Sequence, residues 1–339
     1  MTRRGFTLIE ILVSLMIFTV VSVAMLGIML MASDIYRRGE AGRSANDEAV
    51  AVMAALDEDL SRLVPAADNG WFYASLIDAN GDVTKAGDSV LAFIVTPRDR
   101  SLITSKGERD RTIVAWWLKH ETLDLDGSGT MKAVSVLYRG EGPAPVPDPA
   151  VLNENETALD AIMMLPAAKL AQITTGCLHF GTYIASRAGG RSFAAEWLED
   201  AAGVESLPNR TVPTYDSATQ GFPSAIRITT VLTGGGRFAA RGRVVGDLTD
   251  TATSLRVVGI PSLSTQPGSM VRVSEEGDPA QAEWIGYRGY ANGRLDCTDG
   301  GASDPLVGRG RRRSEARAFT TQAVVEVGQA YTLVRTLPH

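Results

Sequence analysis

The chain has 339 residues, a formal net charge of −6 and 45% hydrophobic residues. That length and hydrophobic content allow a substantial core and exclude a wholly disordered chain. Acidic side chains number 39 and basic ones 33, so the basic face that nucleic-acid partners require is not expected. The one dense basic run, 309–313, is short and flanked by Gly and Ser. We interpret it as a solvated loop, with a contact to phosphate or an acidic partner as the alternative.

The N-terminal region contains a long apolar segment. From Phe6 to Ala32 the only ionisable side chain is Glu10. As a helix this segment would be about 40 Å long, and a bilayer core is about 30 Å thick. A secretory signal peptide is the competing interpretation, but the apolar stretch is too long and no small-x-small cleavage site follows it. Residues 6–32 are therefore predicted to span a membrane.

Residues 3–10 read RRGFTLIE, which resembles the processing signal of type IV pilins and of type II secretion pseudopilins. In that family a prepilin peptidase cuts after the glycine, the new N-terminus is methylated, and the glutamate assists assembly. The resemblance implies that residues 1–5 are a leader ending at Gly5, that Phe6 becomes the methylated N-terminus, and that Glu10 is the assembly glutamate. It also implies an inner-membrane anchor with a periplasmic C-terminal domain.

Physical chemistry supports a special role for Glu10. A carboxylate near the bilayer centre costs on the order of 2.5 kcal/mol or more, and is rarely kept without a partner. The expected partner is the Phe6 ammonium of a neighbouring subunit. The alternative is a glutamate that reaches the interface of an ordinary signal anchor.

Residues 33–64 continue the helix outside the membrane. Apolar side chains recur there at steps of three and four, while charged ones occupy the opposite side. The apolar positions are Ala49, Val52, Met53, Leu56, Leu60 and Leu63. Gly39 and Gly42 are expected to loosen the helix, at about 1 kcal/mol each, and Pro65 is expected to end it.

The remaining chain is rich in predicted strands. An antiparallel meander and one short helix are expected, followed by two further strands. The meander strands are Ser89–Val95, Thr112–Leu118 and Ala133–Tyr138, the helix is Asn155–Leu165, and the later strands are Gly176–Ile184 and Ala225–Leu232. The predicted class is α+β: a long N-terminal helix packed on an antiparallel sheet, as in the pilin fold.

The order of the later segments resembles the pseudopilin J and minor pilin W families. The matching segments are 180–183, Trp197, 223–228 and 331–335. The spacing departs from that pattern, because about a hundred residues separate the strand at Ile226 from the one at Tyr331. We therefore predict a pilin-like β domain over 65–237, an inserted β module over 238–322, and a closing strand within 323–339. The module is expected to be separable.

Two features could bind a metal or form a bridge. Asp124, Asp126, Ser128 and Thr130 match the start of a calcium loop, although Ser135 stands where the bidentate acid is expected. A hairpin turn explains the same residues without metal, and the run 78–82 is a weaker calcium candidate. Cys177 and Cys297 are the only cysteines, and outside the cytoplasm they would form either a disulfide or two buried thiols.

Catalytic motifs are not apparent. The histidines are His120, His179 and His339, and no Gly-x-Ser-x-Gly or phosphate-binding motif is present. His120-Glu121 begins like a zinc-protease motif, but Asp124 occupies its fifth position. We expect no enzyme and no cofactor other than calcium. The predicted function is a minor pilin or pseudopilin that contacts other such subunits, prepilin peptidase and the inner-membrane assembly platform. The rival is a signal-anchored periplasmic binding or enzymatic domain.

Overall fold

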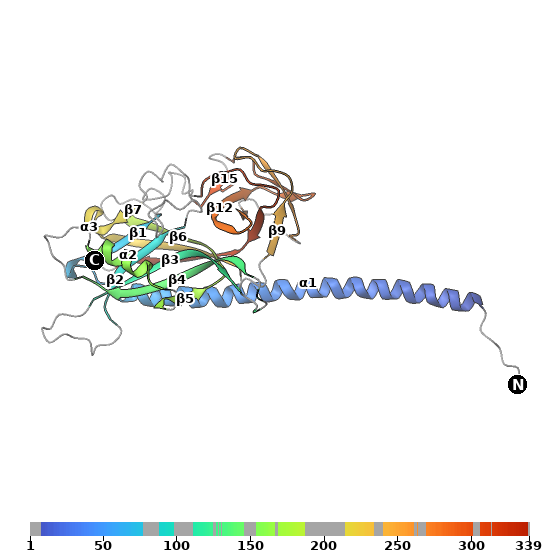
Figure 1. The fold of residues 1–339 in the computed structure, drawn as a ribbon, viewed down its shortest axis with the longest axis horizontal. Helices are drawn as coiled ribbons and strands as arrows, with labels where there is room; N and C mark the ends of the chain where they lie inside the picture. The colour runs from blue at the N-terminus through green and yellow to red at the C-terminus, as the bar shows by residue number, and fades with distance from the viewer. Residues whose placement is uncertain are drawn as a thin grey trace, which may run out of the picture.

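The computed structural model describes most of the chain. The described residues are 8–76, 88–97, 111–124, 127, 129, 131–145, 154–166, 169–186, 214–233, 240–260, 263, 269–300, 306–312 and 314–337. A single long helix runs along one side of the molecule, and a head rich in strands covers only the half of it far from the N-terminus (Figure 1). The expected α+β class is confirmed.

Helix α1 spans Leu8–Ser61 without a break. Gly39 and Gly42 lie within this continuous helix and do not interrupt it, and their expected loosening of the helix stays a prediction. A penalty of about 1 kcal/mol per glycine is too small to interrupt a helix whose distal half is packed against the head. The helix ends four residues before Pro65, which instead precedes a short 3-10 turn, η1, at Ala66–Asp68.

A six-stranded sheet forms the larger layer of the head. Its order is β5-β4-β3-β2-β1-β7, and all neighbours are antiparallel. The strands are β1 Phe72–Ser75, β2 Val90–Val95, β3 Thr112–Leu123, β4 Lys132–Pro143, β5 Ala171–Thr174 and β7 Thr214–Asp216. The predicted meander is therefore confirmed as β2-β3-β4, and the predicted short helix as α2, Glu154–Met163.

Side-chain alternation gives this sheet two apolar faces. Leu91 and Phe93 of β2 join α1 in one core, while Ala92 and Ile94 join α2 in another. Successive side chains of a strand point to opposite faces, so a strand buried on both faces has no polar positions. Helix α2 lies so close to β4 that a Cβ on Gly140 would come within 2.6 Å of the Ile162 side chain.

A three-stranded sheet completes the region predicted as the pilin-like β domain and its closing strand, and we call this sheet and the six-stranded one the pilin sheets. Its order is β17-β8-β6, with β6 Cys177–Ser186, β8 Pro223–Leu232 and β17 Gln329–Thr336. Strands β8 and β17 pair antiparallel over eight positions, from Leu232 with Gln329 to Ala225 with Thr336. The expected pairing of two strands distant in sequence is confirmed. A four-residue helix, α3 (Ser217–Gln220), precedes β8.

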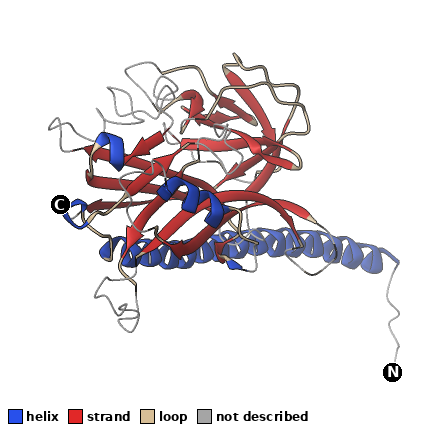
Figure 2. Cartoon of the chain, turned by 60° about the vertical axis from the view of Figure 1, so that its left-hand side comes forward, coloured by secondary structure: helices blue, strands red, loops and turns tan. Residues whose placement is uncertain are grey.

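The described residues between β8 and β17 form the inserted module. Its eight-stranded sheet has the order β13-β14-β10-β9-β16-β11-β12-β15. The strands are β9 Ala240–Val244, β10 Ser254–Val258, β11 Ser269–Glu275, β12 Asp278–Tyr287, β13 Tyr290–Ala291, β14 Arg294–Asp296, β15 Gly308–Arg311 and β16 Val324–Val327. These strands enclose a core of their own. In Figure 1 they form an orange group beside the pilin sheets, and Figure 2 shows that strands make up most of the head.

The module extends further along the chain than its predicted end at Gln322. Strand β16 pairs with β9, and Ala240 lies opposite Val327. The predicted closing segment 323–339 thus contains two strands that belong to different sheets. Because β9 and β16 hold the two ends of the module side by side, the module enters and leaves the pilin sheet at almost one point.

Candidate membrane-anchoring and assembly site

The first half of α1 is apolar and uncovered. Ile11–Ser33 is long and apolar enough to cross a membrane, and none of it is buried within the described chain. Phe18, Ile28 and Met31 each expose more than half of their side chains. Contiguous apolar surface of this extent is unstable in water and requires lipid or other helices around it. This segment therefore fits a membrane anchor.

The residues that define the processing signal lie at the start of this helix. Gly5 and Phe6 fall outside the described residues. Glu10 is the third residue of α1, and its side chain is not described. The backbone places Glu10 at the N-terminal end of the apolar half, immediately before the candidate membrane span Ile11–Ser33.

The second half of α1 attaches the stem to the head. Its buried positions are Ala45, Ala49, Val52, Leu56 and Leu60. The predicted amphipathic helix is therefore confirmed, and its apolar stripe faces the core shared with both pilin sheets.

A buried carboxylate reinforces this attachment. Asp59 is fully buried on the apolar face of α1. It accepts hydrogen bonds from Arg62 at 2.6 Å, from Arg139 at 2.7 and 3.0 Å, and from Trp116 Nε1 at 3.1 Å. Sequence reasoning missed this residue. The available signal was its spacing, because Asp59 lies three residues after Leu56 and so on the apolar face.

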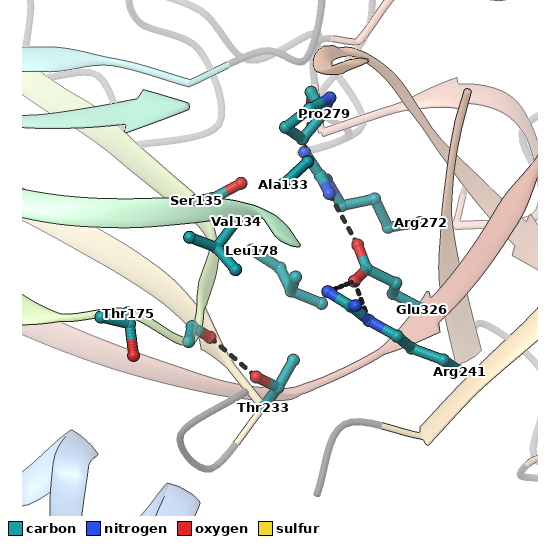
Figure 3. A pocket seen from close by; sticks show the side chains of 11 residues that line it. Ala133, Val134, Ser135, Thr175, Leu178, Thr233, Arg241, Arg272, Pro279 and Glu326 are labelled. Atoms are coloured by element: carbon teal, nitrogen blue, oxygen red, sulfur yellow. Dashed lines mark hydrogen bonds and ion pairs between the residues drawn. The ribbon is translucent and has the colours of Figure 1, made fainter. Parts of the chain in front are cut away.

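The module contacts the pilin sheets through an apolar cluster that lies beside a buried ion cluster of the module itself. Leu178, Val231 and Trp284 form a small apolar cluster between them, and the rings of His179 and Trp284 lie edge to face at 5.8 Å. Beside this cluster, Arg241 and Arg272 both pair with the buried carboxylate of Glu326, at 2.8 Å each (Figure 3).

A serine, a histidine and an aspartate meet near this contact. His120 Nδ1 lies 2.9 Å from Ser135 Oγ, and His120 Nε2 lies 3.9 Å from Asp88. Burial and then the nearby Arg272 lower the pKa of His120 to about 4. The cavity beside Ser135 holds about 20 Å³, which is room for one water. The lowered pKa keeps the His120 imidazole neutral at neutral pH.

The calcium candidate is described only in part. Asp124 accepts a hydrogen bond from the Gly129 backbone N–H at 2.8 Å, as in a polar hairpin turn. Asp126, Ser128, Thr130 and the run 78–82 lie outside the described residues. Calcium binding at Asp124, Asp126, Ser128 and Thr130 stays a prediction.

The two cysteines do not form the bridge considered from the sequence. Both are buried free thiols. Cys177 lies in the core shared by α1 and the pilin sheets, whereas Cys297 lies in the core of the module. Because the two thiols are enclosed in different cores, neither reaches the boundary between the pilin sheets and the module, where a disulfide would have to form.

The interpretation of 309–313 as a solvated loop is also wrong. Arg309 donates two hydrogen bonds of 2.6 Å to the fully buried carboxylate of Glu283. Arg311 pairs with Asp299 at 3.0 Å, and the Arg312 guanidinium lies over the Trp284 ring. All three arginines therefore contact other residues of the module. Arg313 lies outside the described residues. The buried partner, Glu283, is distant in sequence and could not be assigned from the basic run alone.

Comparison with known proteins identifies the N-terminal segment. Residues 1–26 match the family described as the prokaryotic N-terminal methylation motif. The match supports a prepilin-like protein with a processed N-terminus. The match covers the processing signal and most of the exposed apolar half of α1, the two features that a prepilin-like protein needs for anchoring and processing. Searches of curated proteins and of solved structures returned no match.

Proposed function

We propose that this prepilin-like protein is a minor pilin or minor pseudopilin, of the J or W type, at or near the tip of a type IV pilus or a type II secretion pseudopilus. The observation that carries the proposal is the division of α1 into two halves. One half carries the methylation motif and is apolar and uncovered, and the other is packed into the head.

In the proposed pathway the protein is first anchored in the inner membrane by α1, with its head in the periplasm. Prepilin peptidase cuts after Gly5, and an assembly platform draws α1 out of the bilayer into the filament. Apolar surface that loses lipid must then be covered by the helices of neighbouring subunits, which keeps the transfer close to neutral in hydrophobic free energy. The Glu10 carboxylate pairs with the Phe6 ammonium of a neighbour.

The module supports a rare subunit rather than a repeated one. It adds an eight-stranded sheet to the head, and Figure 1 places this sheet beside the pilin sheets, on the side towards the N-terminal half of α1. Bulk of this kind is difficult to repeat at every position of a close-packed shaft. A subunit at the tip has fewer neighbours and tolerates it.

Processing is the first test. Mass spectrometry of the mature protein should find an N-methylated Phe6 at the N-terminus, and Gly5→Leu should leave the precursor uncut. Gly5→Ala is the matched control, since it adds only one methyl group. Normal processing of Gly5→Leu would argue against the proposal and in favour of a signal-anchored periplasmic domain.

Assembly is the second test. Glu10→Ala should insert normally, since it removes a charge from an apolar span, yet co-purify poorly with other prepilin-like subunits. Glu10→Gln keeps the shape and removes the charge, so it should behave like Glu10→Ala if pairing with the Phe6 ammonium matters. Wild-type recovery of partners by both variants would contradict that pairing.

A further inference from the structure

Strand β17 leaves one edge of the three-stranded sheet open. It stands at the end of the order β17-β8-β6 and pairs with β8 alone. The pairing runs over eight residues with no register shift. An edge of this length presents a row of backbone groups to any extended chain that comes near.

The register shows which backbone groups face outward. Leu337 N–H donates to Ser224 C=O at 2.9 Å, so this pair belongs to the hydrogen-bonded set of the ladder. Hydrogen-bonded and non-bonded pairs alternate in an antiparallel ladder. The N–H and C=O groups of Ala330, Thr332, Val334 and Thr336 therefore point away from β8. Within the described parts of the chain, no residue supplies a hydrogen-bond partner to them.

The edge lacks the features that usually prevent strand addition. Natural edge strands carry charged side chains, proline or bulges. Among residues 329–336 the only charged side chain is Arg335, which pairs with Asp57 of α1. The four residues with outward backbone groups are uncharged and exposed, and Val334 is 58% exposed.

The position of β17 decides what can occupy this edge. Its partly buried side chains Tyr331 and Leu333 pack on the core that includes α1, so the edge lies beside the stem. A subunit whose stem packs along α1 would bring its head to this edge. Strand β17 runs towards the C-terminus in the same general direction as α1 (Figure 1). Two copies paired antiparallel through β17 would point their stems in opposite directions, which subunits anchored in one membrane cannot do.

We propose that β17 accepts an extended segment of a different prepilin-like subunit as an added strand. The inference rests on the proposed assembly function and names the surface and the kind of partner. The added strand bonds to the backbone of Ala330, Thr332, Val334 and Thr336. Its specificity comes from side chains that lie beside Thr332 and Val334, and β-branched residues fit that uncharged surface.

Variants at Val334 separate the free edge from the fold. Val334→Pro removes an outward N–H and leaves the β8 ladder intact, and proline is tolerated at such edge positions. Val334→Lys keeps the N–H and adds a charge that discourages pairing. Val334→Thr keeps the β-branched shape and the N–H, and is the matched control. All three variants should retain the thermal melting behaviour of the wild type.

The assay uses the full chain in cells that produce its companion prepilin-like subunits. A photo-cross-linking amino acid replaces Thr332, and in a second strain it replaces Val50, which is exposed on α1. Mass spectrometry identifies the attached peptide. From position 332 we expect a peptide from the head of another prepilin-like subunit. Val334→Pro and Val334→Lys should lower its yield about tenfold or more, since each removes or blocks a strand hydrogen bond, while Val334→Thr should not.

The outcomes distinguish this inference from the proposed function. If position 50 cross-links to other subunits but the yield at 332 is unchanged by proline and lysine, strand addition is wrong and assembly stands. If the peptide at 332 comes from a second copy of this chain, the named partner is wrong. If neither position cross-links to a prepilin-like subunit, the proposed assembly function itself fails, and the strand proposal fails with it.

Discussion

The attachment of stem to head should depend on one carboxylate. Asp59→Asn preserves the size of the side chain but removes the charge that Arg62 and Arg139 share. The side chain of Arg139 is only 13% exposed, so it would keep its charge in a poorly solvated place. Breaking a buried pair in this way costs about 3–5 kcal/mol. The amide would also direct a donor towards groups that are themselves donors.

Chemical denaturation of the detergent-solubilised protein, followed by tryptophan fluorescence, measures this loss. Trp116 donates to Asp59, so its emission reports on the site. The matched control is Asp57→Asn two residues away, where the carboxylate is 55% exposed and pairs with Arg335. A surface pair of that kind contributes at most about 1 kcal/mol. Equal losses for Asp57→Asn and Asp59→Asn would refute the reasoning, because Asp59 is fully buried and accepts from three side chains, whereas Asp57 is exposed and pairs with Arg335.

Three further predictions concern the module, the thiols and acid stability. Replacing residues 233–328 by an Asn-Gly turn should leave a pilin domain that melts cooperatively, because β8 and β17 already pair where the turn would join them. A non-cooperative melt would show that the module is part of the core of that domain. At about pH 8, Cys177 and Cys297 should both resist alkylation in the folded protein, since burial raises their pKa values, that of Cys297 to about 12. Both thiols should react in urea without reductant. Failure to react in urea would indicate a disulfide. The free energy of unfolding should fall as the pH is lowered from about 6.5 to about 4. In this range His120 binds a proton in the unfolded chain but not in the folded one, where burial lowers its pKa to about 4. His120→Gln should flatten this part of the pH profile, and an unchanged slope would contradict the prediction.

Several tertiary features left no local trace in the sequence. The contact of Asp59 with Arg139 joins positions 80 residues apart, and that of Glu283 with Arg309 joins strands of one sheet. Neither pair has a fixed spacing, because the partner of a buried charge is chosen by how strands stack and not by distance along the chain. The run 309–313 was for this reason misread as a solvated loop.

The anchor, the processing signal and the main strands could be predicted from local patterns in the sequence. These depend on local regularities: a continuous apolar segment, a specific string at residues 3–10, and alternation of apolar residues over short ranges. Tertiary structure alone decided that β16 belongs to the module, that Cys177 and Cys297 lie in separate cores, and that β17 has a free edge. The physical reason is that hydrogen bonding between strands and burial in a core are properties of pairs of segments. A strand carries its own periodicity in the sequence, but its neighbour is settled only when the whole chain packs.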